Sequence, residues 1–221
     1  MIRKRAARGS GDQLRGEILG ATRSLLARTA DADDVSIRAI SEAVGVTAPS
    51  IYRHFADKDA LIEAAVAEVI ADLDSVMQRA AALTDGPLQR LRAQGLAYVR
   101  FAREHPEHYR LATMQCAADV GEVDQVLGSA AFLHFRATVV ECMAAGIFAD
   151  GDPLPVAMQL WAAAHGIASL LITKPYLPWG DPEDAADQVL KSACAGHIVA
   201  DLIGRDAGPE ELLAWVERQR P

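Results

Sequence analysis

The residue types best suited to chemistry gather between positions 35 and 58, in the run VSIRAISEAVGVTAPSIYRHFADK. Hydroxyl and guanidinium groups here can hydrogen-bond to the base edges of duplex DNA, and small apolar groups can touch a thymine methyl. Phenol, imidazole and ammonium groups suit backbone phosphates, which fix the register of a protein on DNA without reading sequence. The candidate DNA-contacting residues are Ser36, Arg38, Thr47, Ala48, Pro49, Ser50, Tyr52, Arg53, His54 and Lys58.

Two short helices joined by a glycine turn are predicted to position these side chains. Ser36 is expected to cap the first helix, and Gly45 suits its left-handed end. Thr47 is expected to cap the second helix, with Pro49 in the first turn, where a missing N–H costs nothing. This is a helix-turn-helix arrangement, in which the start of the second helix enters the major groove. Arg38, near the start of the first helix, can reach a base or a phosphate from there.

Amphipathic helices are predicted on both sides of this motif. The first helix has an apolar stripe, and Asp57 is expected to cap a long fourth helix with a stripe of its own. The predicted stripes consist of Leu14, Ile18, Ala21 and Leu25 in the first helix, and of Leu61, Ala65, Val69 and Val76 in the fourth. Both follow the 3.6-residue period of an α-helix.

The rest of the chain also has helical periodicity, and no stretch alternates as a strand would. Proline- and glycine-containing turns separate predicted helices over 87–105, 106–116, 123–148, 153–173, 182–204 and 209–219. The predicted fold is therefore all-α. It comprises an arm and helix-turn-helix DNA-binding head over residues 1–56 and a helical effector-binding and dimerisation domain over 57–221.

The distribution of charge favours a nucleic-acid partner, although the net charge of the chain is −8. Residues 1–60 carry ten Lys and Arg against eight Asp and Glu, whereas residues 61–221 carry twelve against twenty-two. Such asymmetry suggests a DNA-binding module joined to an acidic body. The basic residues between Arg3 and Arg8 form either a solvated tail or an arm that lies in the minor groove.

Composition also bears on the compartment of the protein. Cys116, Cys142 and Cys194 are scattered, which argues against a disulfide framework and favours small buried residues. No run of 18 or more apolar residues occurs, so no membrane-spanning helix is expected. The start of the chain has no apolar segment of the secretory type, and a cytoplasmic location is the expectation.

The run from Ser36 to Ile62 resembles the DNA-binding domain of the TetR (tetracycline repressor) family, over about the first 60 residues. The resemblance rests on the spacing of Gly45-Val46, Tyr52, Phe55, Lys58 and Leu61. It implies a three-helix head, a connecting fourth helix and a variable helical body that dimerises and binds an inducer. It also implies that Tyr52 and Lys58 grip phosphate and that residues 47–50, 53 and 54 contact the operator. The segment 48–50 departs from the common family pattern, so no operator sequence carries over.

A second motif lies in the body, where Trp161, His165 and Gly166 form Trp-x-x-x-His-Gly in an apolar helix. This is similar to a TetR-like subgroup named for that motif. Trp161 and His165 share a helix face because they lie four residues apart. His165 is interpreted first as a core or interface residue, with ligand contact as the alternative.

A pocket for a small apolar or amphipathic effector is hypothesised in the body. Its predicted lining consists of Phe101, Met114, Phe132, Phe135, Trp161 and His165, for which simple core packing is the alternative. His105 and His108 lack an obvious third ligand, so no metal site is predicted, and no cofactor is expected.

Together these patterns predict a DNA-binding transcriptional regulator, a repressor by family precedent, that an effector releases from DNA. Its expected partners are a near-palindromic double-stranded operator, the effector and a second copy bound through residues 153–173 and 182–204. One alternative is a DNA-binding activator or architectural protein without an inducer. A small-molecule-binding helical enzyme is disfavoured, because the chain has no nucleophile elbow, phosphate-binding loop or metal-spaced carboxylate set.

Overall fold

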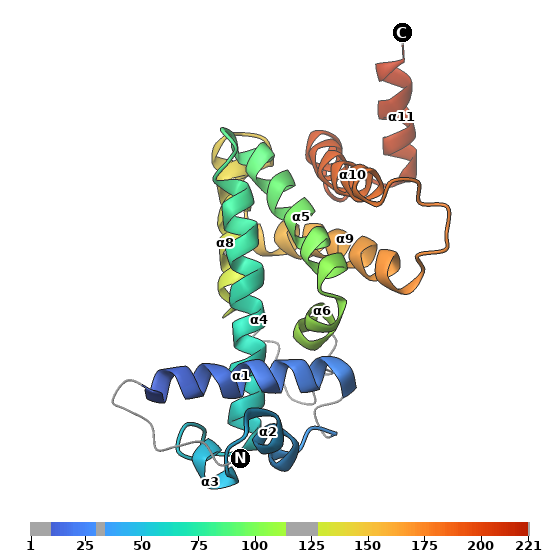
Figure 1. The fold of residues 1–221 in the computed structure, drawn as a ribbon. Coiled ribbons are helices and arrows are strands. Elements are labelled where there is room, and N and C mark those ends of the chain that lie inside the picture. The colour runs from blue at the N-terminus through green and yellow to red at the C-terminus, as the bar shows by residue number, and fades with distance from the viewer. Residues whose placement is uncertain (1–9, 30–33, 114–127, 221) are drawn as a thin grey trace. The chain divides into compact units, whose positions relative to one another are not determined.

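The computed structural model describes residues 10–29, 34–113 and 128–220, and every regular element in these ranges is a helix (Figure 1). The helices are α1 (Ser10–Thr29), α2 (Ile37–Val44), α3 (Ala48–Ile51), α4 (Lys58–Ala81), α5 (Pro87–Glu104), α6 (Pro106–Thr113), α8 (Ala130–Ala144), α9 (Pro153–Thr173), α10 (Pro182–Ile203) and α11 (Pro209–Gln219). The all-α prediction is therefore confirmed. Of the predicted residues, Met114, Cys116 and the basic arm lie outside the described ranges.

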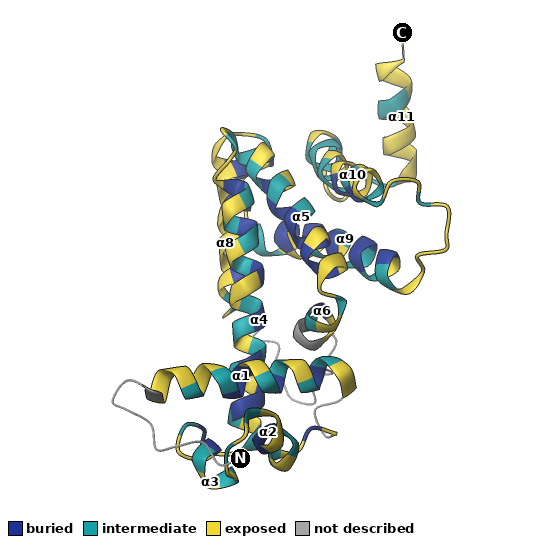
Figure 2. Cartoon of the chain, in the orientation of Figure 1, coloured by how far each residue is buried: buried dark blue, intermediate teal, exposed yellow. Residues whose placement is uncertain are grey.

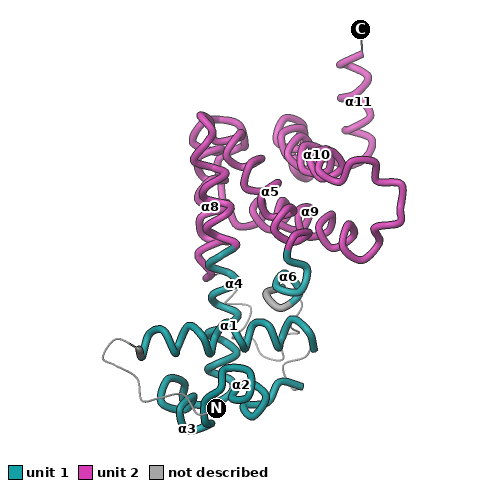
Figure 3. The backbone as a smooth tube through the Cα atoms, viewed as in Figure 1, with its two compact units in different colours: residues 1–72, 105–123 teal, residues 73–104, 124–221 magenta. Residues whose placement is uncertain are grey.

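The chain divides into two compact units (Figure 3). Unit 1 comprises residues 1–72 and 105–123, and unit 2 comprises residues 73–104 and 124–221. The long helix α4 contributes its first part to unit 1 and its last turns to unit 2. The predicted boundary after residue 56 separates a DNA-binding head from an effector-binding domain, whereas the two units are defined by how tightly their residues pack. The predicted functional boundary therefore stays a prediction.

Unit 1 has its own core between α1, α2, α3 and α4. Ile18, Leu26, Ile40, Ile51 and Leu61 are all buried there, and none is more than 2% exposed. Removing such side chains from water contributes roughly 1.5–3 kcal/mol each to folding. This core holds the two short helices α2 and α3 in place, since neither is long enough to be stable alone.

The buried face of α1 differs from the predicted stripe. Ile18 is buried as expected, but the others that lie deepest are Leu19, Thr22 and Leu26, so the face is rotated by about one residue. Thr22 fits an apolar core because its hydroxyl donates to the Ile18 carbonyl oxygen at 2.8 Å. A pattern based on apolar side chains alone misses such a threonine.

In unit 2, α5, α8, α9 and α10 pack around a second core. Gly95 of α5 allows a close approach to α10, because a Cβ at this position would lie 3.0 Å from a methyl carbon of Leu190. The last turns of α4 bury Leu73 and Met77, whereas Val76 of the predicted stripe is only half-buried.

The helix predicted over 123–148 ends earlier than expected, at Ala144. Gly146 has φ of 70°, and the backbone N–H of Ile147 donates to the Cys142 carbonyl at 2.9 Å, which closes the helix in a left-handed turn. Phe148 then returns to the core as a buried residue. The start of this predicted helix, like the end of the one predicted over 106–116, lies outside the described residues.

Helix α9 is long and apolar enough to cross a membrane by length and composition, with mean hydropathy 1.4 over 18 residues. The sequence expectation of no spanning helix considered only uninterrupted apolar runs, which Gln159, His165 and Ser169 break. One such helix is weak evidence for a membrane, because core helices of soluble proteins meet the same criterion. One side of α9 packs on α5, α8 and α10, and the other side is exposed or half-buried (Figure 2).

Candidate nucleic-acid interface and ligand pocket

The turn between α2 and α3 is built from local hydrogen bonds. The Ser36 hydroxyl accepts from the backbone N–H of Ala39 at 3.1 Å and caps α2. Gly45 ends that helix with φ of 77°, and the N–H groups of Gly45 and Val46 both donate to the Ser41 carbonyl at 2.9 and 3.0 Å. These contacts confirm the cap and the stop predicted from the sequence, and they fix the direction in which α3 leaves the turn.

Polar side chains on α3 and at its two ends form a connected row. The hydroxyls of Thr47 and Ser50 lie 3.1 Å apart, and the Arg53 guanidinium donates to the Ser50 hydroxyl at 3.2 Å. Thr47 holds the cap position without a side-chain bond to the backbone, because its hydroxyl pairs with Ser50 instead. The three groups that could read base edges are therefore mutually oriented along one exposed side of the helix.

A hollow of about 760 Å³ lies between α2 and α3. Five candidate DNA-contacting residues line it, namely Arg38, Thr47, Ala48, Ser50 and Tyr52. Tyr52 is 50% exposed, so its phenol is accessible to a partner. The structure therefore brings half of the predicted set to one concave surface.

The other five candidates lie around this hollow rather than in it. Pro49 is exposed on α3, and beyond the end of that helix Arg53 is exposed and His54 is half-buried. Lys58 is half-buried at the start of α4, where the Asp57 carboxylate accepts from the Ala60 N–H at 2.8 Å and confirms the predicted cap. The Ser36 hydroxyl is already engaged by the backbone of its own helix.

Glu42, which sequence reasoning did not single out, faces the same hollow. The guanidinium of Arg38 donates to its carboxylate at 2.9 Å, and this hydrogen bond raises the pKa of Arg38. The Arg38 side chain is 89% exposed, so the pair is solvated and contributes little to stability. A phosphate can replace the carboxylate as the partner of Arg38.

Two cationic contacts brace α1 within unit 1, and neither was predicted from the sequence. The Arg23 guanidinium lies 2.8 Å from the Asp72 carboxylate and 3.5 Å from that of Glu68, both on α4. The Arg15 guanidinium lies 5.2 Å from the centre of the buried Phe55 ring. Both join residues distant in sequence, which is why a local pattern does not reveal them.

In unit 2, three of the six predicted ligand residues come together. The Trp161 ring lies 5.5 Å from that of His165 and 6.4 Å from that of Phe132, edge to face with the latter. His165 Nδ1 lies 3.1 Å from the Tyr98 hydroxyl, and burial lowers the pKa of this histidine. Phe101 is buried on α5, and Phe135 lines a separate cavity.

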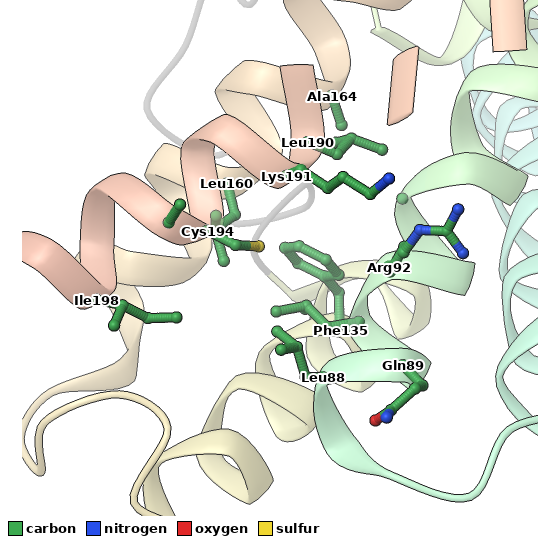
Figure 4. Close-up of a pocket in the computed structure, with 13 residues that line it drawn as sticks. Leu88, Gln89, Arg92, Phe135, Leu160, Ala164, Leu190, Lys191, Cys194 and Ile198 are labelled. Atoms are coloured by element: carbon green, nitrogen blue, oxygen red, sulfur yellow. The ribbon is translucent and has the colours of Figure 1, made fainter. Parts of the chain in front are cut away.

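That cavity has a volume of about 410 Å³ and lies between α5, α8, α9 and α10 (Figure 4). Its wall is largely apolar and includes Leu88, Leu91, Phe135, Leu160, Leu190 and Ile198, together with the half-buried Cys194. The volume is within the range of sites that bind small organic molecules. Of the predicted ligand residues that the structure describes, only Phe135 lines this cavity.

The polar residues of the cavity are Gln89, Arg92 and Lys191. The carboxylate of Asp187, on α10, joins the two cations, with one oxygen 2.5 Å from Arg92 Nε and the other 2.5 Å from Lys191 Nζ. These hydrogen bonds, the one from Arg92 above all, lower the pKa of Asp187 to about 2. A second ion pair, between Arg100 and Glu183, joins the same two helices but does not line the cavity.

Among the described residues, no three His, Cys, Asp or Glu side chains gather in a way that could hold a metal ion. The rings of His105 and His108 stack with centroids 5.8 Å apart. Burial, with a smaller contribution from the charge of Arg23, lowers the pKa of His108.

Comparison with known protein families gives two matches along the chain. Residues 18–65 match the family described as bacterial regulatory proteins, tetR family. Residues 91–193 match the tetracyclin repressor-like C-terminal domain. The protein belongs to the TetR family and is a DNA-binding transcriptional regulator, as the helix-turn-helix residues predicted. The Trp-x-x-x-His-Gly subgroup stays a prediction.

Solved structures share the fold over nearly the whole chain. A Rhodococcus sp. RHA1 protein of unknown function is 26% identical, with TM-score 0.71, covering 89% of this chain and all of its own. A putative transcriptional regulator from Pseudomonas aeruginosa PAO1 is 21% identical, with TM-score 0.71 and coverage of 88% and 95%. A TetR family transcription regulator from Marinobacter aquaeolei VT8 is 16% identical, with TM-score 0.67 and coverage of 85% and 98%. A search of curated proteins gave no match.

Proposed function

We propose that this regulator is a homodimeric repressor that binds a near-palindromic operator and is released from it by a small apolar or amphipathic molecule. The observation that carries the proposal is the exposed α3 surface, where the Thr47, Ser50 and Arg53 side chains are mutually hydrogen-bonded beside the hollow of α2. Side chains held in one orientation lose less conformational entropy on binding than freely rotating ones.

In this proposal α3 lies in the major groove. Thr47, Ser50 and Arg53 read base edges, and the methyl of Ala48 and the ring of Pro49 touch thymine methyls. The backbone phosphates are contacted by the remaining candidates, which are Ser36, Arg38, Tyr52, His54 and Lys58. Arg38 exchanges Glu42 for a phosphate or a base, which costs little because the ion pair is solvated.

The dimer forms through α9 and α10. Helix α9 contains no Asp, Glu, Lys or Arg, yet Met158 and Leu170 are 36% and 43% exposed on it. Gly166 of α9 and Gly196 of α10 face open space, since a Cβ at either position would meet nothing within 4 Å. No contact within the described part of the protomer therefore requires these glycines, whereas close approach of helices from a second copy would.

Two heads related by a twofold axis would then reach half-sites roughly 34–36 Å apart. Effector binding in unit 2 changes DNA affinity only if the ligand prefers one of the two states of the dimer. A coupling free energy of about 1–3 kcal/mol would lower operator affinity some 5- to 150-fold.

Selection of bound duplexes from a random pool with the purified chain, followed by salt titration on the enriched sequence, tests the proposal. A palindromic motif with a steep salt dependence supports a dimeric DNA reader, because each phosphate contact releases counterions. An enriched site without twofold symmetry contradicts the dimer. A thermal-shift screen then seeks the effector, since a ligand that binds the native state raises the melting temperature.

A further inference from the structure

The cavity between α5, α8, α9 and α10 combines an apolar wall with charged side chains, which indicates the chemical class of its ligand. Its wall is apolar, and its charged side chains are both cations, Arg92 and Lys191 (Figure 4). We propose that this cavity binds a carboxylate amphiphile, with the apolar tail between the four helices and the carboxylate at Arg92 and Lys191. The role of that molecule as the effector rests on the proposed function, but its binding does not.

The charged residues beside the cavity favour a carboxylate as the head group of the ligand. Asp187 supplies one carboxylate to the two cations, through Arg92 Nε and Lys191 Nζ, and the charge of Glu183 also acts on Arg92. The Nη groups of Arg92 and the other Nζ hydrogens of Lys191 keep donors for a second anion. Both cationic side chains are more than half exposed, at 51% and 62%, so a ligand can reach them without breaking the core. Charge-assisted hydrogen bonds to a carboxylate are among the stronger ones in proteins.

The apolar lining of the cavity favours a hydrocarbon tail on the ligand. Leu88 and Leu91 of α5, Phe135 of α8 and Leu160 of α9 present hydrocarbon to the same space. Burying an apolar chain there is favoured by about 0.8 kcal/mol for each CH₂ group. A neutral apolar molecule would gain this term alone, and a cationic amphiphile would be repelled by Arg92 and Lys191.

The pocket face of α10 is also distinct from its proposed dimer face. Leu190, Cys194 and Ile198 follow one another at four-residue spacing along the cavity. Gly196 lies on the side opposite this row on a helix with 3.6 residues per turn. Ligand and second copy would therefore contact α10 from opposite sides, which allows the ligand to shift the helix that forms the dimer.

Calorimetric titration of the full chain in the absence of DNA tests the ligand class. Three probes share a ten-carbon tail and differ in the head group: sodium decanoate, 1-decanol and decyltrimethylammonium. Decanoate is expected to bind about tenfold more tightly than decanol, because its carboxylate accepts charge-assisted hydrogen bonds from Arg92 and Lys191. Decyltrimethylammonium is expected to bind most weakly. Equal affinity for decanoate and decanol, or no binding of decanoate, would overturn the proposal.

Variants locate the site. Arg92→Gln with Lys191→Gln is expected to remove the preference for decanoate over decanol, whereas Arg100→Gln, which breaks the other α5–α10 ion pair outside the cavity, is expected to keep it. Cys194→Phe is expected to weaken binding of both probes by filling the cavity. Loss of the preference in Arg100→Gln as well, or full binding by a folded Cys194→Phe, would contradict this location.

A duplex-binding assay with and without decanoate separates this inference from the proposed function. Decanoate that binds the chain but leaves operator affinity unchanged supports the ligand class and removes its role as effector. An operator that binds normally while decanoate fails to bind the chain overturns the ligand class alone.

Discussion

At the scale of single residues, the candidate DNA-contacting side chains differ in the hydrogen bonds that they make within the protein. Ser50 is bonded to both Thr47 and Arg53, whereas Tyr52 is half exposed beside the hollow. Groups that read bases carry sequence preference, and groups that grip phosphate carry affinity without preference. The two kinds of residue can be separated by mutation.

We expect Tyr52→Phe combined with Lys58→Ala to weaken binding to all duplexes and to lower the salt slope by about one for each lost phosphate contact. Arg53→Ala is expected instead to relax preference at one position of each half-site, at a cost of about 1–3 kcal/mol. Fluorescence anisotropy on matched and mismatched duplexes over a range of salt concentrations measures both effects. Identical behaviour of the two variants would mean that the roles are wrongly assigned.

The turn residue Gly45 is the second prediction at this scale. Its φ of 77° is unfavourable for a residue with a Cβ, so Gly45→Ala is expected to destabilise the chain by about 1 kcal/mol. Gly20 lies on the exposed side of α1 with open space around it, and Gly20→Ala is expected to stabilise by roughly 0.5–1 kcal/mol. Urea unfolding compares the two variants, and a loss of stability in both would exclude backbone conformation as the cause.

At the scale of elements, sequence reasoning succeeded where the signal is local. Ser36 and Asp57 cap their helices as predicted, and the predicted range 153–173 of α9 is confirmed to the residue. It failed on the buried face of α1, because Thr22 satisfies its hydroxyl inside its own helix. It also failed on the end of α8, since the turn at Gly146 lies within a continuous helical pattern.

The helix-turn-helix surface and the cavity also differ in how far their residues lie apart in the sequence. The helix-turn-helix residues lie within a few turns of one another, so their spacing in the sequence nearly determines their geometry. The cavity takes its lining from helices as far apart as residues 88 and 198. Apolar residues at helical spacing look alike whether they fill a core or surround a void, so only the packed structure reveals the cavity.

Helix α9 supports a prediction about the dimer. Gly166→Leu adds a side chain where a Cβ meets nothing within the protomer, so the chain is expected to fold while the dimer weakens. Sedimentation equilibrium is expected to show a shift towards monomer, and DNA affinity is expected to fall with it. The matched control is Gly20→Leu, an equal change on α1, a helix of unit 1 that is not part of the proposed dimer interface, and this variant is expected to remain dimeric. A Gly166→Leu chain that stays dimeric would place the interface elsewhere.

At the scale of the whole molecule, stability depends on pH through groups whose pKa values folding shifts. Burial lowers the pKa of His108, His165 and His197 from the ordinary value of 6.5. The folded state therefore binds fewer protons at these sites than the unfolded chain does, and the neutral histidines stabilise it fully only above pH 6.5. Asp187 and Asp201 have pKa values lowered from 3.8, mainly by hydrogen bonds from Arg92 and Arg205, so their stabilisation is lost only at more acidic pH.

The free energy of unfolding is accordingly expected to fall as the pH drops below 6.5, well before the carboxylates are protonated. His165→Gln removes one of the three half-buried histidines whose pKa is lowered, so its decline with pH is expected to be shallower than that of the wild type. Tyr98→Phe removes the hydroxyl 3.1 Å from His165 but leaves the imidazole buried, so it is expected to lower stability while keeping the wild-type decline. Urea unfolding at several values between pH 8 and pH 5 measures the three curves. A His165→Gln curve parallel to that of the wild type would show that another group controls the acid sensitivity of the protein.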